Sequence, residues 1–482
     1  MAPFKVIIIG CGLSGGLLGN GLLHNDVDFT IYESDDAKAG TKRDGYQIRL
    51  GSHAIRGFKA CLTDDQQNVL YKMFGRSGGV LSAAPILYDT QFRQLLDLTK
   101  FPAYSKSAPI NRVVLRDYLQ EKLVAAGRVQ FGKKFTGYSI VDENDSGVHD
   151  ESLRSCKVRV QFADGSEDEC DLLISAEGSR SRINKQIGLD NIVQLQRCWG
   201  FLAKGSLPRA KLLALGPEVH KGPVAVISDG IALFYSAYLP KGTENSNRSE
   251  ARHEDTSNKD NVPEFDEEMS SLFWGLLVPV EKCPENPLAL EDKIGFCLES
   301  IKHWDPRFEG MLRAIDNDDV HVFQPRASNN PGIDWRSKAK SKSGDDPSKG
   351  HDQVWLLGDA IHPMLPSRGM GANQSMSDTA DMLPEIVALR DEAKNLGGIG
   401  SRLEKRHFTT AVQAYESKMI PRAFHWVKMS GGTDETVRDP SSFSGKIMLF
   451  FVAQFLTLAH LISQIKSMLG YKVTDDAPEL PD

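Results

Sequence analysis

The stretch VIIIGCGLSG, residues 6–15, decides the fold of this chain. It opens with four apolar, β-branched residues, which are typical of a parallel strand buried on both faces. The glycines that follow have G-x-G-x-x-G spacing, which allows a tight turn, a close approach to the backbone and close packing of the next helix. The free N–H groups at the start of that helix favour a phosphate. The expected ligand contacts in this stretch are Gly10, Gly12, Leu13, Ser14 and Gly15.

A second strand, residues 29–32, ends next to an acidic side chain. Glu33 follows Gly15 by 18 residues, close to the separation at which a carboxylate binds ribose hydroxyls in dinucleotide-binding folds. Strand, helix, strand and acid therefore occur in the required order, and an incidental glycine-rich turn is the weaker interpretation. The pattern by itself does not distinguish FAD from NAD.

A third strand, residues 354–357, leads into a second cluster of special residues. Asp359 at the end of that strand can accept hydrogen bonds from a ribityl hydroxyl. Pro366 offers a rigid apolar surface without an N–H group, suited to lie beside a flat ring. Residues 369–373 start a helix whose N-terminus stabilises negative charge on a reduced ring. The ligand contacts expected there are Gly369, Gly371, Ala372 and Asn373.

Three further segments complete the pattern. The segment DLLISAEGSRSR at residues 171–182 is a buried strand followed by Glu177 and Gly178. The segment NRVVL places Arg112 at a helix start, and GYQIRL at residues 45–50 contains Arg49. With these segments, residues 4–422 resemble the single-component FAD-dependent aromatic hydroxylases, the group A flavoprotein monooxygenases. The most similar type is the salicylate-hydroxylase-like enzymes of fungal specialised metabolism.

The resemblance implies a role for each of these residues. Asp359 would bind the flavin ribityl chain, and Arg112 would reach the FAD. Glu177 stands where the family usually has aspartate, in a motif linked to both FAD and NADPH. Pro366 would lie near the reactive flavin edge, and we assign it to the catalytic centre together with Arg49. Arg49 is cationic where many relatives are not, so a surface charge remains an alternative for it, as a helix-end charge does for Arg112.

The resemblance also implies the chemistry. In the family, NADPH or NADH reduces the flavin, dioxygen then gives a flavin hydroperoxide, and one oxygen atom passes to an electron-rich aromatic, indole or polyketide-type molecule. Hydroxylation, epoxidation and rearrangement share this route, so the sequence leaves them open. The alternatives are a halogenase or reductase on the same fold and a non-catalytic lipid-carrier or escort protein. A W-x-W-x-I-P element, usual in halogenases, is absent from the sequence.

We predict an α/β fold. A Rossmann-like FAD-binding domain of the GR2 type, with a parallel sheet and helices, would be interleaved with a mixed or antiparallel β-sheet domain. The FAD-binding domain would comprise residues 1–189 and 334–430. Residues 190–333 would form the substrate domain, and residues 431–482 would form a C-terminal helical segment.

Alternating aromatic residues in the substrate domain predict a sheet with one face inward. The resemblance implies that this sheet roofs the flavin and lines the substrate pocket. The candidates are Trp199, Phe201, Phe234, Tyr235, Phe273 and Trp274, of which we expect about half to belong to the core instead. The substrate-binding residues that we single out are Trp199, Phe201, Tyr235 and Trp274.

Two polar stretches, residues 242–261 and 337–352, predict flexible surface loops. Residues 447–465 predict an apolar helix that carries one polar stripe of Gln454, Thr457, His460 and Gln464. A helix docked on the protein or on a second subunit, a membrane-surface helix and a true span are the three interpretations. The docked interpretation predicts that the covered face includes Leu449, Phe450, Leu456 and Leu461.

Composition restricts the remaining possibilities. The 482 residues suffice for two joined domains, and the net charge of −7 argues against a general nucleic-acid partner. Seven cysteines without metal-binding spacing predict reduced thiols and no metal site. We therefore expect an intracellular, cytoplasmic protein without a signal peptide, possible membrane association through the C-terminal helix, and a small molecule and dioxygen as partners.

Overall fold

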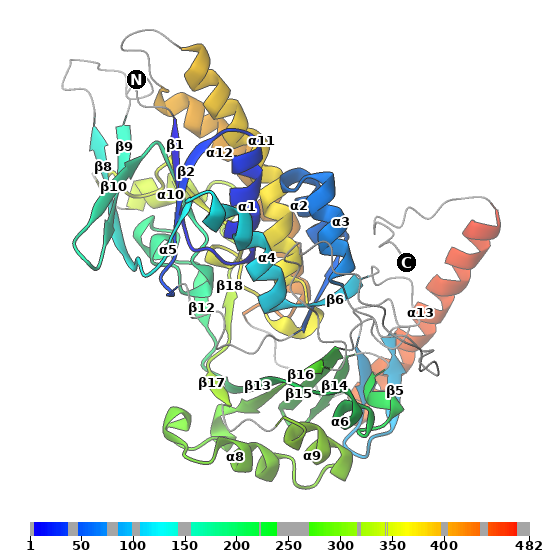
Figure 1. Cartoon of the computed structure of the whole chain (residues 1–482). Coiled ribbons are helices and arrows are strands. Elements are labelled where there is room, and N and C mark those ends of the chain that lie inside the picture. Colours follow the sequence, from blue (N-terminus) through cyan, green and yellow to red (C-terminus); the bar gives the residue numbers. More distant parts are fainter. Residues whose placement is uncertain are drawn as a thin grey trace, which may run out of the picture.

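The computed structural model describes twelve segments of the chain. The α/β prediction is confirmed: a parallel sheet with its helices lies at one end of the molecule, and a mixed sheet lies at the other (Figure 1). The described residues are 4–36, 47–74, 85–98, 107–142, 156–220, 223–238, 269–315, 320–342, 344, 346–396, 403–433 and 442–469.

The parallel sheet has the strand order β19-β11-β1-β2-β7. All four of its ladders are parallel, and every residue of β11 and β19 is buried. The apolar run at the start of the chain therefore forms a central strand, as predicted. The strands are β1 (Lys5–Ile9), β2 (Asp28–Tyr32), β7 (Val129–Gln130), β11 (Leu172–Ser175) and β19 (Val354–Leu356).

Helices pack closely around this sheet because small residues face them. A Cβ on Gly57 of α2 would lie 2.2 Å from the carbonyl oxygen of Met376 in α11, so only glycine allows this approach. The covering helices are α1 (Leu13–His24), α2 (Ser52–Cys61), α3 (Asp64–Lys72), α4 (Arg112–Ala125), α11 (Gly371–Asn395) and α12 (Lys405–Met429). A small antiparallel sheet and one short helix complete the domain: β8 (Phe135–Asp142), β9 (Cys156–Phe162), β10 (Glu167–Cys170) and α5 (Arg182–Gln186).

The second sheet has the order β17-β13-β16-β15-β14-β4-β5 and is mixed, as predicted. Only β4 and β14 pair in parallel among its ladders. Two of its strands, β4 and β5, come from the segment that the sequence assigned to the first part of the FAD-binding domain. The strands are β4 (Ile86–Tyr88), β5 (Gln94–Asp97), β13 (Cys198–Pro208), β14 (Val224–Ser228), β15 (Ile231–Tyr238), β16 (Met269–Pro279) and β17 (His321–Phe323).

Helices cover one face of this sheet, the face directed away from the parallel sheet (Figure 1). They are α6 (Arg209–Leu213), α7 (Pro217–His220), α8 (Lys293–Ser300) and α9 (Pro306–Arg313). Two ribbons join the domains: β3 (Gln47–Gly51) pairs with β6 (Ser107–Asn111), and β12 (Ile192–Gln194) pairs with β18 (Arg326–Ser328). Strand β3 contacts both β15 and β16, so it lies against the other face of the mixed sheet.

The expectation of a flexible loop at residues 337–352 is wrong. Helix α10 (Trp335–Lys342) occupies the start of this stretch. Arg336 is buried and forms an ion pair of 2.8 Å with Glu416 of α12, whose carboxylate also accepts the indole N–H of Trp335 at 3.1 Å. A buried acid far along the chain therefore orders a segment whose composition is that of a loop. Residues 242–261 lie outside the described residues.

The C-terminal helix α13 (Phe443–Met468) stands at the edge of the mixed sheet (Figure 1). It packs on Leu96 and Leu98 through a short row of half-buried residues, Leu449, Ala453 and Leu456. Of the four residues predicted for the covered face, Leu449 and Leu456 are there, whereas Phe450 and Leu461 are exposed. Among the described residues, no helix combines the length and apolar character that crossing a bilayer requires.

Candidate functional site

The ends of strands β1, β11 and β19, from residues 6–15, 171–182 and 354–373, meet at one edge of the parallel sheet, because the carboxyl ends of parallel strands lie together. The amide of Ala176, after β11, donates to the carbonyl of Ile9 at 2.8 Å. The amide of Leu357, after β19, donates to the carbonyl of Ser175 at 2.9 Å. The turns after these strands include two 3₁₀ turns that contact each other, η4 (Gly178–Arg180) and η7 (Gly358–Ala360).

The glycine-rich turn after β1 is shaped for close approach. Gly10 has φ of +105°, and a Cβ there would lie 2.5 Å from the carbonyl oxygen of Ala176. A Cβ on Gly15 would lie 2.1 Å from the carbonyl oxygen of Gly10. A Cβ on Gly12, by contrast, would meet no atom within 4 Å, so open space lies over its backbone beside the N-terminus of α1. This space can receive a pyrophosphate.

The other predicted contacts in the first segment lie around this turn. Glu33 accepts the amide of Cys11 at 2.7 Å and that of Asp35 at 3.0 Å, so its carboxylate is fixed beside the turn. Ser14 is half-buried and faces the turn after β19, since a Cβ on Gly358 would lie 3.3 Å from its hydroxyl. Leu13 is buried in the core beneath the turn, so its backbone alone is placed to meet a ligand.

Asp359 stands at the centre of the candidate site. Asp359 is exposed to solvent. Desolvation by the neighbouring protein nevertheless raises the pKa of its carboxyl, while the charges of His362 and Arg112 oppose the rise. A Cβ on Gly371, at the start of α11, would lie 3.8 Å from its Oδ1. A carboxylate, a guanidinium and the N-terminus of a long helix therefore meet at one accessible place.

A buried charge network that the sequence analysis did not assign supports this turn. His362 Nε2 and Asp378 Oδ2 lie 2.7 Å apart, and the amide of Gly358 donates to the same oxygen at 2.9 Å. Arg422 of α12 donates to the other oxygen at 2.7 Å. Burial opposes ionisation of Asp378, but His362 and Arg422 outweigh it and hold its pKa below the usual range. The sequence signal that could have indicated this network is the presence of His362, Asp378 and Arg422 within the stretch that resembles the hydroxylases, residues 4–422.

Asn373 positions the start of α11. Its amide group donates to the carbonyls of Arg49 at 2.9 Å and Gly369 at 3.0 Å, and its oxygen accepts the amide of Gly51 at 2.8 Å. Both amide hydrogens are used, so the side chain joins α11 to β3. Gly369 adopts φ of +63° with open space around it, and the half-buried Ala372 packs on the core.

Glu177 does not extend toward the open space over Gly12. Its carboxylate accepts the hydroxyls of Ser175 at 2.9 Å and Ser181 at 2.7 Å, and the amide of Ile183 at 3.1 Å. The longer arm relative to aspartate folds back onto the start of α5, where it satisfies free backbone donors. These hydrogen bonds give Glu177 a local structural role, and its expected cofactor contact stays a prediction.

Arg49 lies between the two domains rather than on the surface. It is buried, and it donates to the hydroxyl of Ser107 at 3.1 Å and to the carbonyl of the same residue at 2.7 Å. Burial lowers its pKa to about 10, so it stays cationic at neutral pH. Pro366 is exposed at the start of η8 (Pro366–Arg368), three residues before Gly369.

Comparisons with known proteins agree with this geometry. Residues 323–397, which contain Asp359 and the start of α11, match the family model described as "FAD binding domain". The chain is 23% identical to the FAD-dependent monooxygenase sor5 of Hypocrea jecorina, covering 89% of this chain and 83% of that protein. It is 24% identical to 6-hydroxynicotinate 3-monooxygenase of Bordetella bronchiseptica, covering 81% of this chain and 85% of that one.

A dual O-methyltransferase/FAD-dependent monooxygenase, CTB3 of Cercospora beticola, is 22% identical over 79% of this chain. The chain spans only 42% of CTB3 and less than half of the other relatives of this dual type. Among solved structures, Klebsiella pneumoniae HpxO, complexed with FAD and uric acid, has a TM-score of 0.57 at 18% identity, covering 98% of this chain and 97% of HpxO. The chain is therefore similar to FAD-dependent monooxygenases over most of its length, and it contains a segment that matches an FAD-binding domain.

The fit of the site to FAD follows from the chain's own residues. The open space over Gly12 faces the N-terminus of α1, which suits a pyrophosphate, and Glu33 stands beside it at the end of β2. Asp359 is the accessible acceptor for the ribityl chain, with Arg112 near it. The N-terminus of α11 would face the flavin ring. The roles of the individual residues stay predictions, whereas the FAD-binding domain is established.

The four selected substrate residues of this flavoprotein all lie on the wrong face of the mixed sheet for a pocket at the FAD-binding domain. Trp274 is fully buried and donates its indole N–H to the carbonyl of Leu312 at 3.1 Å. The ring of Phe201 lies 5.0 Å from that of Phe296 in α8. Tyr235 and the half-buried Trp199 belong to the same cluster with α8 and α9. These residues hold the helices against the sheet.

The opposite face carries the other two aromatic candidates. Because side chains alternate along a strand, Phe234 and Phe273 face β3 when Tyr235 and Trp274 face the helices. Both phenylalanines are half-buried. Between them lies Gly275, paired with Phe234, and a Cβ on it would meet no atom within 4 Å. The sequence marked the aromatic residues correctly but did not show which of the two faces is turned inward.

Proposed function

We propose that the chain is an FAD-dependent monooxygenase that uses NAD(P)H and dioxygen to insert one oxygen atom into an electron-rich aromatic, indole or polyketide-type small molecule. The observation that carries this proposal is the accessible carboxylate of Asp359. It lies near the N-terminus of α11 and within electrostatic reach of Arg112, on the domain that meets the inner face of the mixed sheet.

The cofactor and the residues of the chain would have different roles in this reaction. Bound FAD would supply hydride acceptance from NAD(P)H and activation of dioxygen. Phe234, Phe273 and the open space at Gly275 would hold a flat apolar substrate and exclude water from it. The buried cation of Arg49 lies on β3, which contacts that face, and would orient an ionised phenol or a similar oxyanion.

The relatives support an aromatic or heteroaromatic substrate. One relative acts on 6-hydroxynicotinate, and the structure of HpxO contains uric acid. Both compounds are small rings that carry oxygen. No observation on this chain favours a halogenase, a reductase or a lipid carrier, although each remains an outcome of the test below.

The test is a screen for substrate-stimulated NADPH and NADH oxidation by the purified, FAD-loaded chain. Hydroxylated aromatics, indoles and aromatic polyketides are the probes, and products are analysed by mass for one added oxygen atom. The proposal predicts coupled oxidation and oxygen insertion with at least one class. Product halogenation, oxidation of NAD(P)H without product, or tight lipid binding without FAD would each contradict it.

A matched pair of variants tests on which face of the mixed sheet the substrate binds. Phe273→Ala should raise KM for the stimulating substrate while FAD content is unchanged, because its ring lies on the inner face. Leu298→Ala on the helical side of the sheet, where the side chain is half-buried in the outer cluster, should leave KM unchanged.

A further inference from the structure

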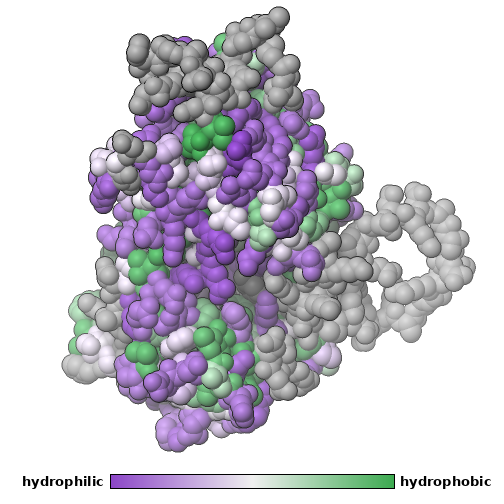
Figure 2. Space-filling model, turned by 90° about the vertical axis from the view of Figure 1, so that its left-hand side faces the viewer, coloured by the Kyte–Doolittle hydropathy of each residue, from purple (hydrophilic) through white to green (hydrophobic). Residues whose placement is uncertain are grey.

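Exposed apolar side chains are unevenly distributed over the described surface. Outside the C-terminal helix they occur singly, for example Leu288 at 59% and Ile333 at 74% exposure. The face of the molecule in Figure 2 is largely hydrophilic, with small apolar patches. Soluble monomers rarely expose a large continuous apolar area, so an exception marks an interaction surface. Helix α13 is that exception.

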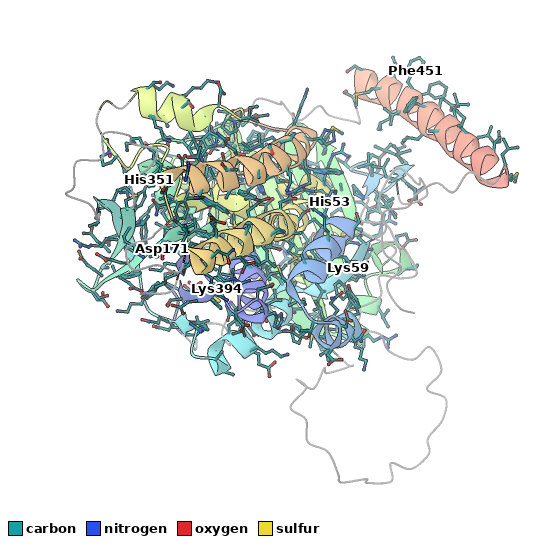
Figure 3. All side chains as sticks on the ribbon, turned by 90° about the horizontal axis from the view of Figure 1, so that it is seen from above. His53, Lys59, Asp171, His351, Lys394 and Phe451 are labelled. Atoms are coloured by element: carbon teal, nitrogen blue, oxygen red, sulfur yellow. The ribbon has the colours of Figure 1, made fainter. Side chains whose placement is uncertain are left out.

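Helix α13 has a covered stripe and an exposed arc. The covered stripe consists of Leu449, Ala453 and Leu456. At about 100° per residue, the opposite side of the helix is mostly apolar, with the exposed Gln454 as its one polar residue among those that the structure describes. The apolar residues of this exposed arc, all between 46% and 70% exposed, are Phe451, Phe455, Leu458, Leu461, Ile462 and Ile465. Figure 3 shows Phe451 on the side of α13 turned away from the rest of the molecule.

The charges around α13 indicate what covers this arc. The chain has a net charge of −7, yet no acidic residue occurs between Asp439 and Asp475. Lys446 and Lys466 bracket the apolar segment in the sequence. An apolar helix flanked by lysines, in a stretch without carboxylates, is complementary to anionic lipid headgroups around an acyl boundary.

A second copy of the chain fits the arc less well. Antiparallel pairing of two copies of α13 would bring the helix end that carries Lys446 in one copy near the end that carries Lys466 in the other. The positively charged ends would then lie together without a carboxylate from this stretch to neutralise them. A lipid surface has no such conflict, because its headgroups supply the opposite charge.

We propose that α13 lies flat on an anionic membrane surface, with its exposed arc among the headgroups and the upper acyl chains. The covered stripe keeps the helix attached to the sheet edge, where it packs on Leu96 and Leu98, and Leu96 is paired with Leu87 of β4. Leu87 alternates with Ile86 and Tyr88 of the outer cluster, so it lies on the inner face of the sheet. The membrane surface therefore adjoins the face of the sheet that meets the FAD-binding domain.

The test is flotation of the full-length, FAD-loaded chain with phosphatidylcholine vesicles that contain or lack phosphatidylserine. The chain should float with both kinds of vesicle and bind the anionic ones more strongly. Replacing Phe451, Phe455 and Leu458 by serine together should weaken binding by at least about tenfold, because three apolar side chains leave the lipid. The matched control is Leu288→Ser with Ile333→Ser, two equally exposed residues outside α13.

The outcomes are distinguishable. Flotation that the triple variant loses and the control retains supports the proposal, provided that both keep their FAD. Phe451→Ser alone should give a smaller loss in the same direction, which covers the case of a misfolded triple variant. Absence of wild-type flotation, equal flotation of the triple variant, or a wild-type dimer that the triple variant converts to a monomer in light scattering would each overturn the proposal.

Discussion

The edge of the parallel sheet and the inner face of the mixed sheet are specified by different kinds of residue. At the edge of the parallel sheet, glycines and short backbone contacts fix the geometry, as when a Cβ on Gly15 would fall 2.1 Å from a carbonyl oxygen. In the mixed sheet, aromatic side chains alternate between two faces that are equally apolar, as the pair Phe273 and Trp274 shows.

The difference teaches that a backbone constraint can be located in a sequence, whereas the orientation of a sheet face cannot. A position at which only glycine fits can be recognised in the sequence from the glycine itself. An aromatic residue in an alternating strand lies on one of two faces, and the sequence of the strand does not show which. The helices α8 and α9, later in the chain, determine which face they cover. Substitutions at the two places test this difference.

The largest expected effect distinguishes the two faces of β16. Trp274→Ala should lower the free energy of unfolding by about 3–5 kcal/mol, because it leaves a cavity under α9 and removes an indole hydrogen bond. Chemical denaturation measures this loss. A stable Trp274→Ala variant that instead loses substrate would show that our assignment of the faces is reversed.

The next effect tests the edge of the parallel sheet. Asp359→Ala should weaken FAD binding by about 1.5–3 kcal/mol, or one to two decades in Kd, because a charged acceptor is lost. Titration of the apoprotein with FAD measures it. Pro366→Ala is the matched control, since it removes loop stiffness rather than a polar contact, and it should lower turnover with FAD binding retained. Unchanged FAD affinity in Asp359→Ala would refute the assignment.

The pH dependence of FAD affinity follows from the same carboxyl. Surrounding protein raises the pKa of Asp359 above its usual value, and FAD requires the ionised form as acceptor. Binding therefore releases a proton, so affinity is complete above this pKa and falls by at most about tenfold per pH unit below it. Asp359→Asn should bind more weakly and give a flatter acid limb; an identical limb in both proteins would assign the titration elsewhere.

The smallest effect concerns Glu177. Glu177→Ala should cost about 0.5–2 kcal/mol of stability, as expected for loss of a carboxylate at a helix start. KM for NADPH should stay the same, because the carboxylate is engaged by Ser175, Ser181 and Ile183. A raised KM with unchanged stability would restore the cofactor role that the sequence suggested.

Much of the fold and of the FAD-binding edge could be predicted from the sequence, because local rules govern both. The strand before Gly10, the turn and the helix after it, and the start of α11 at Gly371 all follow from short-range pattern. The folding back of Glu177 could not be predicted, since it depends on hydroxyls at Ser175 and Ser181 that converge only in three dimensions.

Two other features depend on long-range contacts. The order of α10 rests on Glu416, some 80 positions after Arg336. The support of the Asp359 turn by Arg422 depends on how α12 packs against α11. No local pattern carries this information, because the partners are joined only by the tertiary fold.

The most direct test of the central claim is the flavin content of the purified chain. The spectrum is recorded, the protein is precipitated with acid, and the FAD in the supernatant is quantified per chain. We predict close to one FAD per chain, released into the supernatant, because polar contacts and the N-termini of α1 and α11 hold it without a covalent bond. A colourless chain that takes up no added FAD, or flavin that remains in the pellet, would contradict this account.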